Sequence, residues 1–164
     1  IYKGLLRDSD NGIAEALLLM IANKNGGTFK TKFAIDSLVS RWNGWLPDKL
    51  EWVDGSGVSR YNMLTPRTLV SVLQKIDQQI SFETIQSLFP KSGVSGTLKS
   101  YKGLENVYAK TGTLQHNYSL SGYWLNSKRK RFAFSIMVNH YIEPITEIRK
   151  GISELLTWIQ MKLE

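Results

Sequence analysis

The chain changes character near residue 106, and this change restricts its fold more than any other feature. Three segments rich in aromatic and β-branched residues follow one another, at residues 107–114, 118–126 and 131–140. Short polar connectors separate them, which is typical of consecutive antiparallel strands. The next segment, 144–163, repeats isoleucine and leucine at helical spacing. We therefore predict a three-stranded antiparallel sheet with one long helix packed on one face.

The residues before this sheet predict helices. Apolar residues recur at helical spacing in four segments, which span residues 9–22, 28–42, 66–76 and 82–89. The first opens on Ser9, Asp10 and Asn11, which are residue types favoured at helix N-caps. The third begins with Pro66 directly after Thr65, an order typical of a helix start. The predicted fold class is α/β of the α+β type, with a helical cluster at one end of the sheet.

The composition restricts the chemistry of the chain. Its 164 residues suit one domain, and 42% hydrophobic with 21% charged residues indicates a globular protein. The absence of cysteine excludes disulfides, thiolate catalysis and cysteine metal sites. His116 and His140 are the only histidines, and neither has a second histidine at ligand spacing. We therefore predict neither a metal site nor a cofactor.

The longest apolar run, residues 16–22, is too short to cross a bilayer. No signal peptide is visible, and the chain starts at Ile1 rather than Met. We expect the sequence to be a piece of a longer protein, with any export signal in the part that precedes it.

The formal net charge of +7 fits an anionic polymer, nucleic acid or simple solubility. The densest basic cluster, Lys-Arg-Lys-Arg at 128–131, falls between two predicted strands and indicates a solvated turn. The alternating aromatic residues that a single-strand nucleic-acid groove needs are missing around it. We expect no nucleic-acid partner.

A lysine and three small residues, Lys110, Thr111, Gly112 and Thr113, lie in the first predicted strand. Alternation places Tyr108, Lys110 and Gly112 on one face and the two threonines on the other. Gly112 lets a ligand backbone approach the strand, whose edge can pair with an extended peptide. The lysine can hold a carboxylate or lower the pKa of a neighbouring nucleophile. Taken alone, this segment is explained more simply by a surface lysine followed by a Thr-Gly bulge.

The Ser9-Asp10-Asn11 triplet also has two interpretations. It can be only a helix cap, or it can present a hydroxyl that relays a proton and an amide, Asn11, that holds a substrate. The order S-x-x-K, S-D-N and K-T-G is the signature of penicillin-binding proteins and serine β-lactamases. Two of these three motifs occur here in the right order. Their combination favours the functional interpretation of both.

The whole chain resembles the C-terminal part of the class C, low-molecular-mass penicillin-binding proteins, the D-alanyl-D-alanine carboxypeptidases/endopeptidases. The resemblance rests on "DSDNGIAEALL", "DGSGVSRYNMLTP", "SGVSGTLK", "AKTGTL" and "SLSGYW". The glycine loop, "DGSGVSR" at 54–60, separates this family from the β-lactamases, which share only the short triplets. The resemblance implies the penicillin-binding transpeptidase-like fold, in which helices flank an antiparallel sheet.

The family mechanism implies a role for each matching residue. Ser9 would shuttle a proton to the leaving amine, Asn11 would orient the substrate, and Lys110 would lie near Ser9 and keep the site electropositive. Thr113 would bind the terminal carboxylate of the substrate, and its backbone would form part of the oxyanion hole. The implied substrate-binding residues are Thr111, Gly112, Thr113 and Arg60.

One element of the family pattern is absent. The nucleophile lies in an S-x-x-K upstream of S-D-N, but the only S-x-x-K here is Ser127 to Lys130, after K-T-G and in a predicted turn. We therefore expect residues 1–164 to be the C-terminal portion of one peptidase domain that is inactive without its N-terminal part. An alternative is a non-catalytic domain that binds peptidoglycan or a partner protein. A third hypothesis, a basic nucleic-acid module, would show a steep salt dependence.

The resemblance also implies partners and location. The full-length protein would bind the peptidoglycan stem peptide and β-lactams, in the periplasm or elsewhere outside the cytoplasm. Missing upstream strands would leave apolar sheet surface exposed, so association with another chain is expected.

Overall fold

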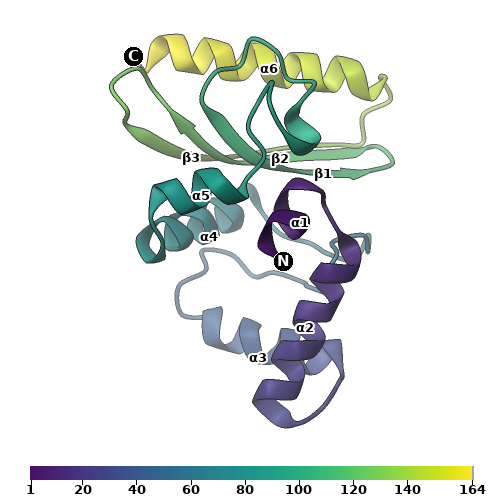
Figure 1. Ribbon diagram of the computed structural model, residues 1–164. Coiled ribbons are helices and arrows are strands. Elements are labelled where there is room, and N and C mark those ends of the chain that lie inside the picture. The colour runs from purple at the N-terminus through teal and green to yellow at the C-terminus, as the bar shows by residue number, and fades with distance from the viewer. Residues whose placement is uncertain (164) are drawn as a thin grey trace.

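The computed structural model describes residues 1–163 as helices on both sides of one sheet (Figure 1). Helix α6 lies along one face of the sheet, and α4 and α5 lie on the other, with α2 and α3 further away. The elements in chain order are α1 Tyr2–Arg7, α2 Asn11–Gly26, α3 Thr31–Trp42, α4 Pro66–Gln79, α5 Phe82–Leu88, the 3-10 turn η1 Gly96–Leu98, β1 Val107–Leu114, β2 Asn117–Leu125, β3 Arg131–Asn139 and α6 Ile145–Lys162.

The sheet has the predicted antiparallel order β1-β2-β3. Lys110 of β1 pairs with Ser121, and Gly112 pairs with Ser119. Successive side chains of β1 enter different cores, since Val107 packs in the α6 cluster and Tyr108 packs in the α4–α5 cluster. The predicted alternation along this strand is confirmed. It places Lys110 on the α4–α5 side of the sheet.

The predicted C-terminal helix is confirmed as α6, and it closes the larger core. Its Ile152 and Leu156 are each only 4% exposed against Leu120 and Trp124 of β2. Burying an aliphatic side chain of this size contributes about 1.5–3 kcal/mol. These contacts hold the sheet flat against one helix and leave its other face for α4 and α5. Among residues 1–163, no helix is both long enough and apolar enough to cross a membrane.

Helix α2 begins within the predicted cap triplet but extends further than predicted. Asp10 is the N-cap, and its carboxylate accepts a hydrogen bond from the Ile13 amide at 2.9 Å. The helix continues past residue 22 and ends only where Gly27 adopts a left-handed φ of 63°. Asparagine and lysine at 23–25 are polar but compatible with a helix, so the glycine sets the end. With Asp10 as the cap, the Ser9 side chain is left available to other partners.

Two elements were not predicted. Helix α1 has only six residues, and its N-cap is Ile1, whose side chain cannot form a cap bond. The sequence therefore contains no start signal for this helix. The turn η1 has only three residues. Both are too short to produce a hydrophobic periodicity.

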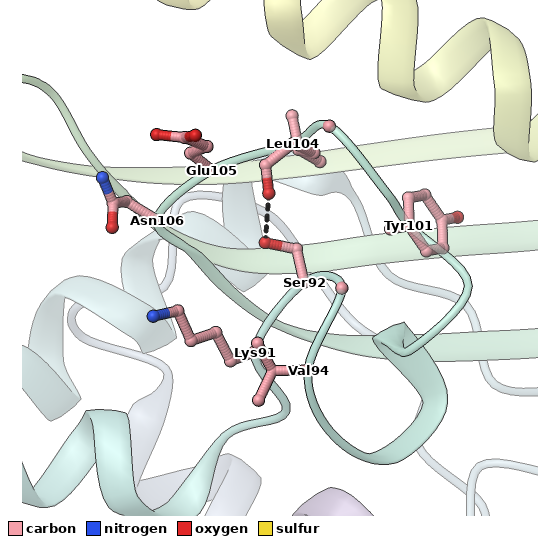
Figure 2. A pocket seen from close by; sticks show the side chains of 9 residues that line it. Lys91, Ser92, Val94, Tyr101, Leu104, Glu105 and Asn106 are labelled. Carbon is pink, nitrogen blue, oxygen red and sulfur yellow. Dashed lines mark hydrogen bonds between the residues drawn. The ribbon is translucent and has the colours of Figure 1, made fainter.

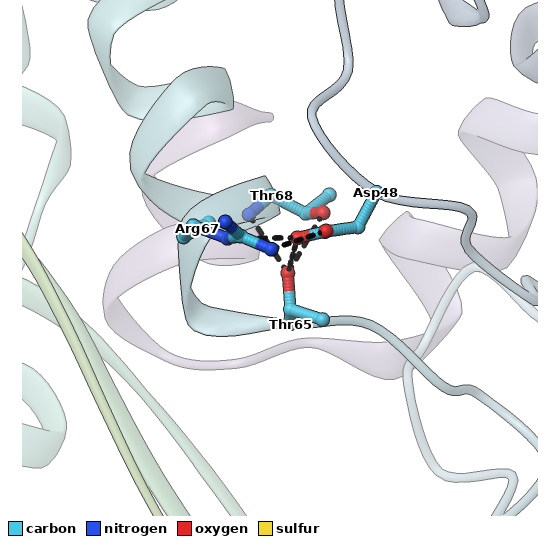
Figure 3. A network of polar contacts seen from close by, with 4 residues as sticks. All are labelled: Asp48, Thr65, Arg67 and Thr68. Atoms are coloured by element: carbon cyan, nitrogen blue, oxygen red, sulfur yellow. Dashed lines mark hydrogen bonds and ion pairs between the residues drawn. The ribbon is translucent and has the colours of Figure 1, made fainter.

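A polar network fixes the start of α4 (Figure 3). The Thr65 hydroxyl accepts the Thr68 amide at 3.2 Å and donates to the Asp48 carboxylate, which also accepts a 2.7 Å bond from Arg67. The bond from Thr65, followed by the Arg67 contact, lowers the pKa of Asp48. The network ties the connection between α3 and α4 at both ends, and this connection contains the glycine loop 54–60.

Candidate functional site

Two side chains that are 101 positions apart in sequence meet in the structure. The Lys110 ammonium donates to the Ser9 hydroxyl, and it also donates to the Thr111 carbonyl oxygen at 2.7 Å. Ser9 lies between α1 and α2, whereas Lys110 is in the middle of β1. The expectation that Lys110 lies near Ser9 is therefore confirmed as a contact.

The surroundings of Lys110 make its charged form less stable than it is in water. Burial lowers the pKa of Lys110 below its ordinary value. The partners of its ammonium are a hydroxyl and a carbonyl, and among residues 1–163 it forms no ion pair. The ammonium therefore keeps an uncompensated charge near Ser9. Its lowered pKa also makes a proton exchange between the two groups less costly.

The backbone of Ser9 is held in an unusual conformation. Its φ is 55°, in the left-handed region that a non-glycine residue rarely adopts, at a cost of about 1–3 kcal/mol. The following Asp10 amide donates to the Gly4 carbonyl at 3.2 Å, which folds the α1–α2 junction back on itself. This bend turns the Ser9 hydroxyl toward β1. Asn11 begins α2 beside it with an exposed side chain.

Among residues 1–163, backbone hydrogen bonds cover the outer edge of β1 only over its first half. The Ala109 amide donates to the Pro90 carbonyl at 3.1 Å, and the Val107 carbonyl accepts from Ser92 at 3.0 Å. Backbone groups alternate in an antiparallel strand, so those of Thr111 and Thr113 point toward this same edge. The exposed Thr113 therefore presents its amide where the strand is no longer covered. Such an edge can pair with an extended peptide.

The small residues next to Lys110 have neighbours within the protein. A β-carbon on Gly112 would lie 2.5 Å from the Ser119 hydroxyl oxygen of β2, so the glycine makes room for that side chain. The Thr111 hydroxyl donates to the Thr97 hydroxyl of η1 at 2.9 Å. Packing inside the sheet thus explains Gly112 without a ligand.

The glycine loop is organised by the Asp54 carboxylate. Its two oxygens accept bonds from the amides of Gly57 at 2.6 Å and Ser59 at 2.7 Å, and from the Asn62 side chain at 3.0 Å. Trp52 donates to the Asp54 carbonyl at 2.5 Å. Acidic side chains that accept several loop amides hold a tight turn closed.

The same loop docks on α2, the helix that follows Ser9. The Ser56 amide donates to the Glu15 carboxylate at 2.9 Å. A β-carbon on Gly55 would lie 2.7 Å from the carbonyl oxygen of Ala14, so only glycine permits this approach. The loop is therefore fixed to the helix whose first turn bears Asn11. Arg60, at the end of the loop, is exposed and forms no ion pair among residues 1–163.

The single S-x-x-K of the sequence lies where it was predicted, in the turn between β2 and β3. Ser127 and Lys130 are exposed, and Asn126 closes the turn by accepting the Lys130 amide at 2.8 Å. This is not a buried helix start.

A hollow lies elsewhere, in the loop between α5 and β1 (Figure 2). It has a volume of about 340 Å³, and its lining includes Lys91, Ser92, Tyr101 and Glu105 but none of the predicted site residues. Figure 2 shows the Ser92 hydroxyl donating to the Leu104 carbonyl, a bond of 2.5 Å that closes this loop.

Three residues near the site were not singled out from the sequence. Asp54 and Glu15 hold the glycine loop, and Thr97 holds Thr111. All three fall inside quoted motifs, Glu15 in "DSDNGIAEALL", Asp54 in "DGSGVSR" and Thr97 in "SGVSGTLK", so the motifs contained the signal but the role of each position did not follow from it.

Comparison with known proteins identifies the family of the chain. The profile of the D-Ala-D-Ala carboxypeptidase 3 (S13) family matches residues 1–159. The chain belongs to this family. The D-alanyl-D-alanine carboxypeptidase DacB of Haemophilus influenzae is 32% identical over 151 residues, covering 86% of this chain and 31% of that protein. The D-alanyl-D-alanine carboxypeptidase of Actinomadura sp. strain R39 is 31% identical over 150 residues, covering 85% of this chain and 28% of its own length.

A crystal structure of penicillin binding protein 4 (dacB) from H. influenzae, complexed with a β-lactam, has the same fold. It superposes with a TM-score of 0.80 at 27% identity, over 94% of this chain and 40% of that chain. The antiparallel sheet and its helices are thus part of a penicillin-binding fold, as predicted. The chain spans about a third of the length of the curated relatives it matches.

Proposed function

We propose that this chain supplies one half of the active site of a serine-type D-Ala-D-Ala carboxypeptidase/endopeptidase. The observation that supports it is the contact between the Lys110 ammonium and the Ser9 hydroxyl, next to the half of the β1 edge that bears Thr113. A nucleophilic serine, supplied by residues outside the printed sequence, would attack the peptide bond between the two D-alanines. An acyl-enzyme would form, and water would release it.

The residues of this chain would divide the work as follows. Ser9 would pass the proton of the nucleophile to the leaving amine, assisted by Lys110, whose lowered pKa reduces the cost of that transfer. Asn11 would orient the substrate amide. The outward amide of Thr113 would help to stabilise the oxyanion, and its hydroxyl would bind the terminal carboxylate, with Arg60 as a further carboxylate contact.

The partners follow from this chemistry. The substrate would be the stem peptide of peptidoglycan, and β-lactams would acylate the same serine. Such a substrate places the protein in the bacterial envelope, outside the cytoplasm. No metal and no cofactor takes part in this mechanism.

Labelling with a fluorescent penicillin tests the proposal. The 164-residue chain alone should give no covalent band, whereas the gene product extended upstream through an S-x-x-K should give one. In the extended protein, Ser9→Ala and Lys110→Ala should slow labelling about 10²–10⁴-fold, as expected for the loss of acid–base catalysis. Ser127→Ala is the matched control, because it removes the only other S-x-x-K serine, and labelling should be unchanged.

Two outcomes would contradict the proposal. A labelled band from the 164-residue chain that disappears with Ser127→Ala would make Ser127 the nucleophile. An upstream sequence without S-x-x-K, in a protein that binds stem peptide without cleaving it, would favour the alternative of a non-catalytic peptidoglycan-binding domain.

A further inference from the structure

The connection from α5 to β1, residues 90–106, is fastened to the edge of the sheet at several points. Besides the backbone bonds of Pro90 and Ser92 to β1, it buries Leu98, Tyr101 and Leu104 in the α6 core, each at most 3% exposed. The Tyr101 hydroxyl lies 2.6 Å from the Tyr118 hydroxyl of β2. A segment held by so many contacts can act as a rigid support for its neighbours.

The turn η1 occupies the space between the two parts of the candidate site. Gly96 has a φ of 55°, and a β-carbon there would lie 2.6 Å from the Arg7 carbonyl oxygen, two residues before Ser9. On its other side, the Thr97 hydroxyl accepts the hydrogen bond from Thr111 at 2.9 Å. The turn thus contacts the Ser9 segment through a backbone and β1 through a side chain.

These contacts close a ring. Its members, in order, are Arg7, Ser9, Lys110, Thr111, Thr97 and Gly96. The contact between Ser9 and Lys110 is one link, and η1 is the opposite link. A change in η1 must therefore alter either the Thr111 side chain or the separation between β1 and the α1–α2 junction.

We propose that Thr97 is a positioning residue, whose hydroxyl holds Thr111 and thereby sets the uncovered edge of β1 relative to Ser9. Thr97 itself touches no reacting atom in this scheme. The consequence for substrate rests on the proposed function, because the same edge would bind the D-Ala-D-Ala end of the peptide. The positioning itself rests only on the contacts of η1.

The test compares Thr97→Val, which removes the hydroxyl at nearly constant volume, with Thr97→Ser, which keeps it. Thr157→Val is the matched control, because Thr157 is equally half-buried and its hydroxyl bonds the Ser153 carbonyl at 2.8 Å within α6. The first readout, on the 164-residue chain without ligand, is the Thr111 χ1 rotamer from three-bond couplings. The second is the dissociation constant of an N-acetylated peptide that ends in D-Ala-D-Ala, from amide shifts.

We expect Thr97→Val to average the Thr111 rotamer and to weaken peptide binding about three- to tenfold, the range for one lost hydroxyl bond. Thr97→Ser should restore both readouts, and Thr157→Val should change neither, even where it lowers the Tm. Thr97→Val without an effect on either readout, or Thr97→Ser behaving like Thr97→Val, would overturn the proposal. So would an averaged rotamer with unchanged affinity.

The two proposals fail in different ways. Absence of peptide binding to the wild-type chain, with the Thr111 rotamer averaged only in Thr97→Val, would count against the proposed function and leave the role of η1 in holding Thr111. Peptide binding that Thr97→Val does not weaken would leave the proposed function and remove the positioning role.

Discussion

Two regions contain the residues predicted to act, and they are built in opposite ways. At the first, Ser9 and Lys110 come from distant parts of the chain, and their side chains meet directly. At the second, the glycine loop 54–60, the Asp54 carboxylate accepts bonds from the nearby amides of Gly57 and Ser59, and Arg60 remains exposed. The Ser9-Asp10-Asn11 and Lys110-Thr111-Gly112 triplets therefore bring reactive side chains together through a tertiary contact. The glycine loop instead forms a tight turn that packs on α2.

This comparison can be tested at the docking point of the loop. Gly55→Ala places a β-carbon 2.7 Å from the Ala14 carbonyl, so the loop or α2 must move. We expect the free energy of unfolding to fall by about 2–3 kcal/mol, measured by urea denaturation. Gly44→Ala is the control, because nothing lies within 4 Å of the added carbon. An equal loss in both variants would show that Gly55 does not serve to admit α2.

The next effect concerns the centre of the loop. Asp54→Asn removes one acceptor oxygen and the negative charge that three donors share. We expect a loss of about 1–2 kcal/mol and faster hydrogen exchange at the Gly57 and Ser59 amides. The amides of β1 should be unaffected, since the two regions are separate. Glu51→Gln, which loses only an exposed ion pair with Lys49, should cost less than about 0.5 kcal/mol.

If the β1 amides exchanged faster in Asp54→Asn as well, the loop and the Lys110 region would form one cooperative unit. The Ser9–Lys110 contact and the glycine loop 54–60 would then not be independent regions.

Periodicity predicted the elements well because they are long enough to show it. The three strands, α6 and the start of α4 at Pro66 lie where the pattern placed them, within a residue or two at their ends. The six-residue helix α1 and the turn η1 were not predicted, because both are too short to show a repeating pattern of apolar residues. The predicted end of α2 at residue 22 was too early, because the polar residues that follow the last apolar one continue the helix until Gly27 ends it.

The candidate site shows a different limit. That Ser9 and Lys110 meet could be expected only from the resemblance, since nothing in either segment encodes a partner 101 positions away. All three residues of the Ser9-Asp10-Asn11 triplet are of cap-forming types. The sequence therefore could not show that Asp10 is the N-cap and that Ser9 adopts a left-handed φ. Thr97 contacts Thr111 only through the folded path of residues 90–106, which no local rule describes.

The third effect concerns Lys110 and appears as a dependence on pH. Burial lowers the pKa of Lys110 in the folded state, so between that value and 10.5 the unfolded chain binds more protons. Stability from this group must therefore rise with pH across that window. We expect the unfolding free energy of the wild type, relative to Lys110→Met, to increase as the pH rises from neutrality toward 10.5.

Taking the difference between the two proteins is essential. Burial also raises the pKa of Tyr101, Tyr118 and Tyr123, so both proteins should lose stability once the pH exceeds the ordinary tyrosine value. A difference that stays constant with pH would show that Lys110 is as well solvated as a surface lysine. The contrast between the desolvated Lys110 and the exposed Arg60 would then disappear.

The smallest effect on stability is expected at Arg60, where an effect on stability and an effect on substrate binding can be told apart most clearly. Arg60→Ala removes an exposed side chain without an ion pair among residues 1–163, so the unfolding free energy should change by less than about 0.5 kcal/mol. If Arg60 contacts the substrate carboxylate, the same variant should weaken binding of a D-Ala-D-Ala peptide severalfold, and Arg60→Lys should restore part of it. Unchanged affinity in Arg60→Ala would confine the carboxylate contact to the β1 edge. The glycine loop would then serve the site through its shape alone.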